Sequence, residues 1–266
     1  MNVPAISTPL LRFFRRIVRG YFRRHFHAVR IAHASRFKDA SGPLIVYANH
    51  SSWWDPMVCM LLAAELMPER DHYAPMDAAA LEKYAILKRL GIFPVEISSP
   101  RGAVQFLRTG EAILAAGAVL WVTPQGRFAD PRERPLAFKP GMAALAARTA
   151  ASMGSCTLLP LAIEYPFWDE RLPETLLCFA GPVVVTAGET AESVQQRAMA
   201  ALEAALDEIK AKALARDPSG FDLLVRGSLG AGGFYALGKR LRALVTRRPY
   251  VPEHTPVQAL RQELPK

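Results

Sequence analysis

The sequence predicts an α/β fold in which a largely parallel central sheet is flanked by helices. From about residue 29, short runs rich in β-branched and aromatic residues alternate with longer runs of helical periodicity. Such alternation is typical of chains that build parallel sheets. The 266 residues are enough for one ordinary domain with extensions, and the hydrophobic share of 51% excludes extended disorder.

The individual elements follow from this alternation. The predicted strands span residues 29–36, 44–48, 72–75, 92–96, 118–123, 158–165, 175–179 and 183–185. The predicted helices span residues 56–66, 78–90, 102–116, 142–151 and 191–213. Sites in parallel sheets form at the carboxyl ends of strands, so the loops after these strands are where we expect functional residues.

The segment before the alternation is predicted to be a basic amphipathic helix. Between residues 10 and 29, apolar side chains recur with helical spacing and form one broad face. The other side carries Arg12, Arg15, Arg16, Arg19, Arg23 and Arg24. Aromatic rings beneath arginines are typical of a helix that lies in an anionic membrane interface. The side chains expected to insert are Phe13, Phe14, Ile17 and Phe22. The alternative is a helix that packs on the core while its arginines are solvated.

The charge of the chain is concentrated at its two ends. The formal net charge is +9, yet residues 1–38 and 223–252 hold many Lys and Arg and no acidic residue. The arginines near the N-terminus are interleaved with strongly apolar residues, and no nucleic-acid recognition motif follows them. We therefore expect an anionic membrane surface as the partner, and no nucleic acid.

The composition changes again after about residue 216. Several glycines between residues 227 and 233 precede a basic amphipathic run at 234–245 and a proline-rich tail. The predicted organisation is a membrane-surface helix at 1–28, an α/β domain at 29–216, and a glycine-rich joint, short basic helix and tail at 217–266.

The cysteines and apolar segments indicate where the protein works. Cys59, Cys156 and Cys178 lack the CxxC spacing of a zinc site and are uneven in number, so we expect buried thiols. No secretory signal is recognisable, and the apolar stretches are shorter than the roughly 18 residues of a spanning helix. The expected location is cytoplasmic, peripheral on the inner face of the cell membrane.

Residues 49–56 carry the strongest functional signal. His50 leaves a predicted strand and Asp55 begins a predicted helix, so the carboxylate can fold back onto the imidazole ring. An aspartate in that position fixes the tautomer and stabilises the imidazolium, which leaves the other ring nitrogen free as a general base. For an isolated His-x4-Asp, the alternative is a surface histidine with an aspartate that caps the helix before Pro56.

Further segments follow in a fixed order. They are residues 90–96 (LGIFPVE), 123–127 (TPQGR), 138–141 (FKPG) and 159–163 (LPLAI). Together with Asn49-His50-x4-Asp55-Pro56, they resemble the signature blocks of the glycerolipid acyltransferase family, the lysophosphatidate acyltransferase-like proteins. The resemblance spans about residues 44–165. It implies an O-acyltransferase with His50 as general base and Asp55 as its support.

Several positions depart from the family pattern. The second block keeps its acid at Glu96, but its arginine falls on Ile97. The third block has Gln125 in place of glutamate, and its arginine falls on Phe128, so Arg127 is displaced by one position. In the family these positions are associated with holding the acceptor and its phosphate. The resemblance therefore supports acyl transfer more strongly than it supports lysophosphatidate as the acceptor.

The substrate-binding side chains are expected in these blocks and in the loop after the third one. Lys139 supplies a positive charge there, and the free amides where Gly141 begins a helix supply donors. This makes an anion site for a phosphate of the acceptor or of coenzyme A, and the alternative is a solvated charged loop. Arg101 is a candidate to replace the missing second-block arginine. The predicted substrate-binding residues are Asn49, Glu96, Arg101, Gln125, Gly126, Arg127, Lys139 and Gly141.

The sequence therefore predicts a peripheral-membrane acyltransferase. It would move a fatty acyl group from acyl-CoA or acyl carrier protein to a hydroxyl of a lysophospholipid or related lipid acceptor. No Gly-x-Ser-x-Gly segment is present to form an acyl-enzyme, and no metal or organic cofactor is implied. Two alternatives remain: a lipid or thioester hydrolase that activates water with the same pair, and a non-catalytic membrane-binding family member.

Overall fold

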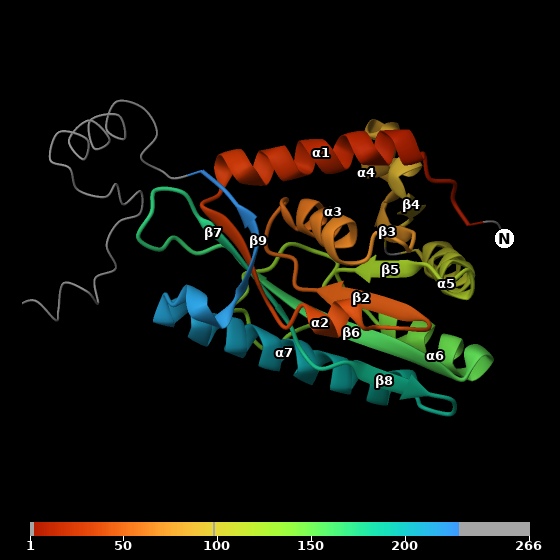
Figure 1. The fold of residues 1–266 in the computed structure, drawn as a ribbon. Coiled ribbons are helices and arrows are strands. Elements are labelled where there is room, and N and C mark those ends of the chain that lie inside the picture. Colours follow the sequence, from red (N-terminus) through yellow and green to blue (C-terminus); the bar gives the residue numbers. More distant parts are fainter. Residues whose placement is uncertain (1–2, 98, 229–266) are drawn as a thin grey trace, which may run out of the picture.

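The computed structural model describes residues 3–97 and 99–228, which form a nine-stranded sheet with helices on both faces (Figure 1). The strands are β1 (Ala28–Ala32), β2 (Leu44–Ala48), β3 (His72–Asp77), β4 (Ile92–Val95), β5 (Val119–Val122), β6 (Ser155–Glu164), β7 (Glu174–Phe179), β8 (Val183–Thr186) and β9 (Asp222–Arg226). The α-helices are α1 (Thr8–His25), α2 (Ser35–Lys38), α3 (Asp55–Leu66), α4 (Ala78–Lys83), α5 (Pro100–Ala115), α6 (Gly141–Met153) and α7 (Ala191–Ala215). The short 3₁₀ helices are η1 (Ala85–Leu90) and η2 (Pro218–Gly220).

The strand order is β4-β3-β5-β2-β6-β7-β1-β9, and β8 pairs with β6. From β4 to β6 every neighbouring pair is parallel, and β7 and β1 are also parallel. The β6–β7, β6–β8 and β1–β9 pairs are antiparallel. The predicted α/β fold, with a largely parallel sheet flanked by helices, is therefore confirmed.

The core lies in two layers, one on each face of the sheet. Successive residues of β2 point into different layers. Val46 belongs to the layer that includes residues of α1 and α3, and Tyr47 belongs to the layer that includes residues of α5, α6 and α7. All five residues of β2 are buried, as expected for a central parallel strand covered on both faces. The strand that carries the His50 loop is thus held rigidly from both sides.

Helix α1 lies across the outside of α3 and has two different apolar faces (Figure 1). Val18 and Phe22 are buried in the core layer beneath the helix. Phe13 and Ile17 are about half exposed, at 58% and 48%. The expectation that Phe22 inserts into a membrane is therefore wrong, because its ring already packs inside the protein. Within the described ranges, 3–97 and 99–228, no helix is both long and apolar enough to cross a bilayer.

Two predicted boundaries change. The strand predicted at 29–36 ends at residue 32, because His33 has a positive φ of 59° and α2 begins soon after. The domain predicted to end at residue 216 continues, because β9 pairs with β1 and Gly227 N donates to His27 O at 2.9 Å. Gly227 is required there, since a Cβ at this position would lie 1.9 Å from Phe26 O. The predicted helix at 234–245 lies outside the described residues.

The environment of His72 on β3 indicates that the fold loses stability at acid pH. Its Nε2 donates to Met67 O at 2.8 Å, and its Nδ1 accepts from Trp121 Nε1 at 3.0 Å, which is a hydrogen-bonding pattern for the neutral ring. Burial lowers the pKa of His72 to about 4. In the unfolded chain the His72 imidazole takes up a proton near pH 6.5, whereas in the folded chain it does so only near pH 4. The unfolding free energy therefore falls as the pH drops from 6.5 to 4.

The expected loss between pH 7 and pH 5 is about 2 kcal/mol of unfolding free energy from this group. Urea titrations of the wild-type protein and of His72→Gln at both pH values measure it. Glutamine keeps a hydrogen-bonding side chain and does not titrate, so the variant should lose less stability on acidification. Equal losses in the two proteins would show that His72 does not contribute.

Candidate active site

Three loops that follow neighbouring strands meet at one edge of the sheet. His50 follows the end of β2, and Gln125 follows the end of β5. Tyr165 follows β6 on the other side of β2. Because β2 is parallel to both neighbours, the carboxyl ends of the three strands lie at the same edge. The structure thus brings these side chains together around His50.

His50 and Asp55 form the pair that the sequence predicts. His50 Nδ1 lies 2.8 Å from Asp55 Oδ2, and that oxygen also accepts from Ser51 N at 2.8 Å and Ser52 N at 2.9 Å. Asp55 is only 1% exposed, whereas the His50 side chain is 19% exposed. A carboxylate can only accept, so Nδ1 carries the proton and Nε2 is the acceptor nitrogen, without a hydrogen-bond partner among residues 3–97 and 99–228. The arrangement is that of an oriented general base.

Tyr165 is a third member of this group that the sequence analysis missed. Its hydroxyl donates to Asp55 Oδ1 at 2.7 Å. Burial first, and the nearby Asp55 charge second, raise the pKa of Tyr165 well above its usual value, so the hydroxyl stays protonated as a donor. Its ring packs against Trp54 and Phe26, with centroids 5.2 and 6.0 Å apart. Both oxygens of Asp55 are therefore fixed by hydrogen bonds.

The main chain on either side of the imidazole is also held. Asn49 Nδ2 donates to Ile163 O at 3.0 Å, and Ile163 N donates to Asn49 Oδ1 at 2.8 Å, which ties the loop to β6. Gln125 Oε1 accepts from His50 N at 2.9 Å. Asn49 and Gln125 are 1% and 8% exposed. These contacts favour a role for both residues in positioning His50, and their predicted contact with substrate stays a prediction.

An exposed aromatic ring covers part of the imidazole. The rings of Phe128 and His50 have centroids 4.3 Å apart and are tilted by 36°. Phe128 is 58% exposed, and the next residue, Ala129, donates its N–H to His50 O at 2.8 Å. The chain after Gln125 thus folds back over the His50 loop and places a phenyl ring over the face of the imidazole.

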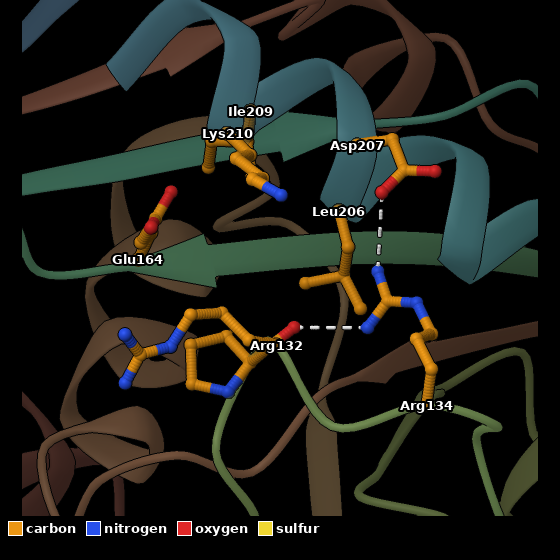
Figure 2. A pocket seen from close by; sticks show the side chains of 8 residues that line it. Arg132, Arg134, Glu164, Leu206, Asp207, Ile209 and Lys210 are labelled. Atoms are coloured by element: carbon orange, nitrogen blue, oxygen red, sulfur yellow. Dashed lines mark hydrogen bonds and ion pairs between the residues drawn. The ribbon is translucent and has the colours of Figure 1, made fainter. Parts of the chain in front are cut away.

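The arginines of the loop after Phe128 are paired with acids. Arg127 pairs with Glu133, and Arg132 pairs with Asp130 at 2.7 Å. Figure 2 shows Arg134 reaching α7, where its guanidinium lies 3.3 Å from Asp207. The predicted use of Arg127 as a free anion ligand is not what its contacts show.

Lys139 differs from these arginines. Within residues 3–97 and 99–228, no acidic side chain pairs with it. Its stem lies against Gly126, which has a positive φ of 63° and where a Cβ would come within 2.6 Å of Lys139 Cε. Gly141 is the first residue of α6. Lys139 and the start of α6 therefore remain together as a candidate anion site.

Glu96 and Arg101 lie apart from this group. Glu96 follows β4, which is separated from β2 by β3 and β5, so it lies on the order of 14 Å away along the sheet. Its carboxylate accepts from Ser99 Oγ at 3.1 Å, and Arg101 is exposed on the first turn of α5. Neither residue contacts the His50–Asp55 pair directly. Both lie at the β4 end of the same sheet.

A small cavity of about 80 Å³ lies beneath the arginine loop, between β6 and α7 (Figure 2). Arg132, Glu164 and Lys210 line it together with Arg134. Burial raises the pKa of Glu164, and within the part of the chain that the structure describes its Oε2 has no hydrogen-bond partner. We assign no substrate to this cavity.

One group of side chains in the described residues has metal-ligand character. Donor atoms of His33, Cys178 and Glu208 lie within 4.8 Å of one another. His33 Nε2 already bonds Glu208 Oε1 at 2.8 Å, and Lys212 approaches the same carboxylate at 3.7 Å. Burial raises the pKa of Cys178 to about 12, so the thiol is protonated at neutral pH. The group is occupied by an ion pair beside a buried thiol, which does not favour metal binding.

Removing the Tyr165 hydroxyl is expected to weaken catalysis without unfolding the protein. Tyr165→Phe keeps the ring contacts but leaves Asp55 Oδ1 without its donor, so the carboxylate is less firmly oriented toward His50. We expect kcat to fall about tenfold while KM for either substrate changes little. Steady-state kinetics measure this split, and Tyr73→Phe, which loses a hydrogen bond to Pro4 O, is the matched control. An unchanged kcat in Tyr165→Phe would show that this bond has no positioning role.

Comparison with known proteins agrees with this geometry. The sequence matches the Acyltransferase family over residues 26–164, a segment that contains β1 to β6 and the His50 loop. Among curated protein sequences, none matches this chain. The fold is similar to the crystal structure of the 1-acyl-sn-glycerophosphate acyltransferase PlsC from Thermotoga maritima, with a TM-score of 0.57 at 16% identity over 76% of this chain and 80% of that one. Because the family match covers more than half of the sequence, the resemblance predicted from its motifs is confirmed, and the chain belongs to the acyltransferase family.

Proposed function

We propose that this acyltransferase moves a fatty acyl group from an acyl thioester to a hydroxyl of a lysophospholipid or related lipid acceptor at a membrane surface. The observation that carries the proposal is the His50–Asp55 pair, in which Nδ1 is held by the carboxylate at 2.8 Å and Nε2 has no hydrogen-bond partner among the described residues. The pair lies at the carboxyl edge of the sheet, within the segment that matches the family. Acyl-CoA and acyl carrier protein are the two donors that fit.

The proposed step needs only one base. His50 Nε2 accepts the proton of the acceptor hydroxyl as that oxygen attacks the thioester carbonyl carbon. Asp55 stabilises the imidazolium without taking its proton, as the aspartate of a catalytic triad does. The tetrahedral intermediate collapses, the carbon–sulfur bond breaks, and His50 returns the proton to the leaving thiolate. The new ester and a free thiol are the products.

The candidate anion site is proposed to hold a phosphate of the donor. Lys139 is unpaired among the described acids, and the first amides of α6 are free donors because a helix leaves its first N–H groups unbonded. Coenzyme A and the phosphopantetheine arm of a carrier protein both carry phosphate. The site therefore supports an acyl thioester donor without separating these two.

The membrane-facing surface is proposed to be the side of the molecule formed by α1 and its neighbours. Figure 1 shows α1 and α4 on the same outer side of the sheet. The exposed large apolar side chains on α1, at the junction of α4 with η1, in η1 and on the loop before α3 are Phe13, Ile17, Trp53, Tyr84 and Ile86. Apolar side chains beside the arginines of α1 give both insertion and attraction to anionic lipid. Trp53 belongs to the same loop as His50, so an inserted surface brings the base near lipid.

Binding to vesicles is expected to have a salt-sensitive part and a salt-resistant part. Arginines near an anionic surface each contribute on the order of 1 kcal/mol, which salt screens, whereas apolar burial is not screened. Phe13→Ser combined with Ile17→Ser should remove most of the salt-resistant binding to anionic vesicles in a flotation assay. Val184→Ser combined with Leu214→Ser, also at exposed apolar positions, is the matched control.

Full-length variants are needed for this test. Deleting residues 1–28 would also remove Phe22 and Phe26 from the core, so the truncated protein would lose stability for reasons unrelated to membranes. Equal flotation of the Phe13/Ile17 and control variants at high salt would show that α1 is a packing element. Neutral vesicles should bind the wild-type protein less well than anionic ones.

The function itself is tested in the native host. Deletion of the encoding gene should remove one class of acylated lipid from the lipid mass spectrum, and re-expression of the wild-type protein should restore it. Re-expression of His50→Ala at the same protein level should not. Restoration of the lipid by His50→Ala would overturn the proposal, because the base would then be dispensable.

A further inference from the structure

The surroundings of His50 Nε2 carry information about the acceptor. The free nitrogen lies at the edge of an imidazole whose face is covered by Phe128, with centroids 4.3 Å apart. Nδ1, on the far side of the ring, is taken by Asp55. A hydroxyl that reaches Nε2 therefore brings the atoms next to it against the exposed phenyl ring. Phe128 therefore gives the site an apolar surface next to the base.

The arginines near this surface are paired with acids, and Lys139, unpaired among the described acids and beside Gly126, is the cation proposed above for a phosphate of the donor. Arg127 donates to Phe128 O at 3.2 Å and pairs with Glu133, so its guanidinium is turned to the loop itself. Arg132 makes a two-pronged contact with Asp130, through Nε at 2.8 Å and Nη2 at 2.7 Å. The guanidinium fork that best binds phosphate is thus already used for a carboxylate.

Opening these pairs would not create a phosphate site. Exposed ion pairs contribute little to stability, so a ligand can separate them. The carboxylates of Glu133 and Asp130 nevertheless remain in the same short loop, and they offset the arginine charges whether or not the pairs are closed. Arg134 is turned away to Asp207 on α7. Glu133 and Asp130 therefore offset the charges that Arg127 and Arg132 bring to this loop.

Gln125, which bonds the main chain of His50, is uncharged as well. Gln125 is buried, and its Oε1 accepts from the His50 amide at 2.9 Å. A phosphate next to the reacting hydroxyl would lie near this phenyl ring, and would lose hydration without gaining one of these paired arginines as a dedicated cation. An uncharged head group meets no such penalty.

We propose that the acceptor is an uncharged hydroxylated lipid, whose head group is a glycerol or a sugar with no phosphate beside the reacting hydroxyl. The inference rests on the proposed acyl transfer and names the substrate class of that same site. The C–H face of the polyol packs on Phe128, and its hydroxyl donates to His50 Nε2. That oxygen forms the new bond to the acyl carbon, the thiolate leaves, and the proton passes through His50 to the thiol.

An acceptor comparison with the full-length protein tests this. The acceptors are a monoacylglycerol, a monoglycosyl diacylglycerol and lysophosphatidate, each in the same mixed micelles and each supplied with acyl-CoA and with acyl carrier protein as donor. Ester products are quantified by mass spectrometry. We expect kcat/KM for at least one uncharged lipid to exceed that for lysophosphatidate by tenfold or more. Comparison of the monoacylglycerol with the monoglycosyl diacylglycerol shows whether the head group is a glycerol or a sugar.

The outcomes separate this inference from the proposed function. If lysophosphatidate is the best acceptor, the inference is overturned and acyl transfer to lipid stands. If no acceptor is esterified with either donor while both thioesters are hydrolysed, the proposed function fails as well. Preference for a zwitterionic lysolipid added as a fourth acceptor would also overturn the inference, because that head group carries phosphate.

Variants at Phe128 provide a second readout. Phe128→Ala should raise KM for the uncharged acceptor about tenfold and leave KM for the donor unchanged. Phe128→Arg, which adds an unpaired guanidinium beside the base, should shift the ratio of kcat/KM values toward lysophosphatidate. Leu223→Ala, at an exposed apolar position on β9, is the control. It should change neither KM for the uncharged acceptor nor the ratio of kcat/KM values between the uncharged acceptor and lysophosphatidate. A ratio that is the same in all three variants would contradict a role for Phe128 in acceptor choice.

Discussion

Replacing His50 with alanine is expected to lower kcat by about 10²–10⁴-fold or more, which is the usual loss when a general base is removed. The fold should persist, because the imidazole is partly exposed and its loop is held through the main chain by Gln125 and Ala129. Asp55 keeps the donors Ser51 N, Ser52 N and Tyr165 Oη in the variant. Steady-state kinetics and a thermal unfolding curve of the same preparation measure both effects.

The matched control is His33→Ala. His33 is also a partly exposed histidine with a carboxylate partner, but it bonds Glu208 on α7 and lies after β1 rather than after β2. Its loss should change kcat by less than a few fold. If folded His50→Ala turned over as fast as His33→Ala, His50 would not be the base.

Asp55→Asn is expected to be nearly as damaging to turnover, by up to about 10⁴-fold, for a different reason. The amide cannot replace both oxygens that accept from His50, Ser51, Ser52 and Tyr165. An amide nitrogen facing Nδ1 would favour the tautomer with its proton on Nε2, and that form cannot act as the base. The buried donors left without an acceptor should also cost about 1–3 kcal/mol of unfolding free energy.

Kinetics and urea unfolding of Asp55→Asn separate the two consequences. Both kcat and the unfolding free energy should fall, whereas His50→Ala should lower kcat with little change in stability. An Asp55→Asn protein within tenfold of wild-type kcat would show that Asp55 does not set the tautomer. Asp77→Asn is a useful comparison, because Asp77 also accepts a main-chain amide near a helix start, from Ala80 N at 2.9 Å, away from the His50 loop.

The parts of the site that the sequence predicts are local in the chain. His50 and Asp55 are five residues apart, and a strand end followed by a helix start is enough to bring them together. Tyr165 contacts the same carboxylate from 110 residues away. Its position depends on β6 pairing with β2, and no local pattern of residues reports which strands are neighbours.

The same limit applies to other residues. Asn49 and Gln125 are polar residues at strand ends, which favours substrate contact when only the sequence is considered. The structure uses their side chains to tie β2 to β6 and β5 to the His50 loop. In α1, helical periodicity identifies apolar positions but does not say whether Phe22 meets the core or a membrane. The buried layer beneath the helix decides that question.

The most direct test of the account is a reaction of purified protein with an acyl thioester and a lipid acceptor, in which ester, free fatty acid and thiol are all quantified. Ester and thiol should form in equal amounts, thiol release should depend on the acceptor, and His50→Ala should lose both products together. Thiol and free fatty acid released in equal amounts without ester would contradict this mechanism. The His50–Asp55 pair would then activate water, and the protein would be a thioester hydrolase built on an acyltransferase fold.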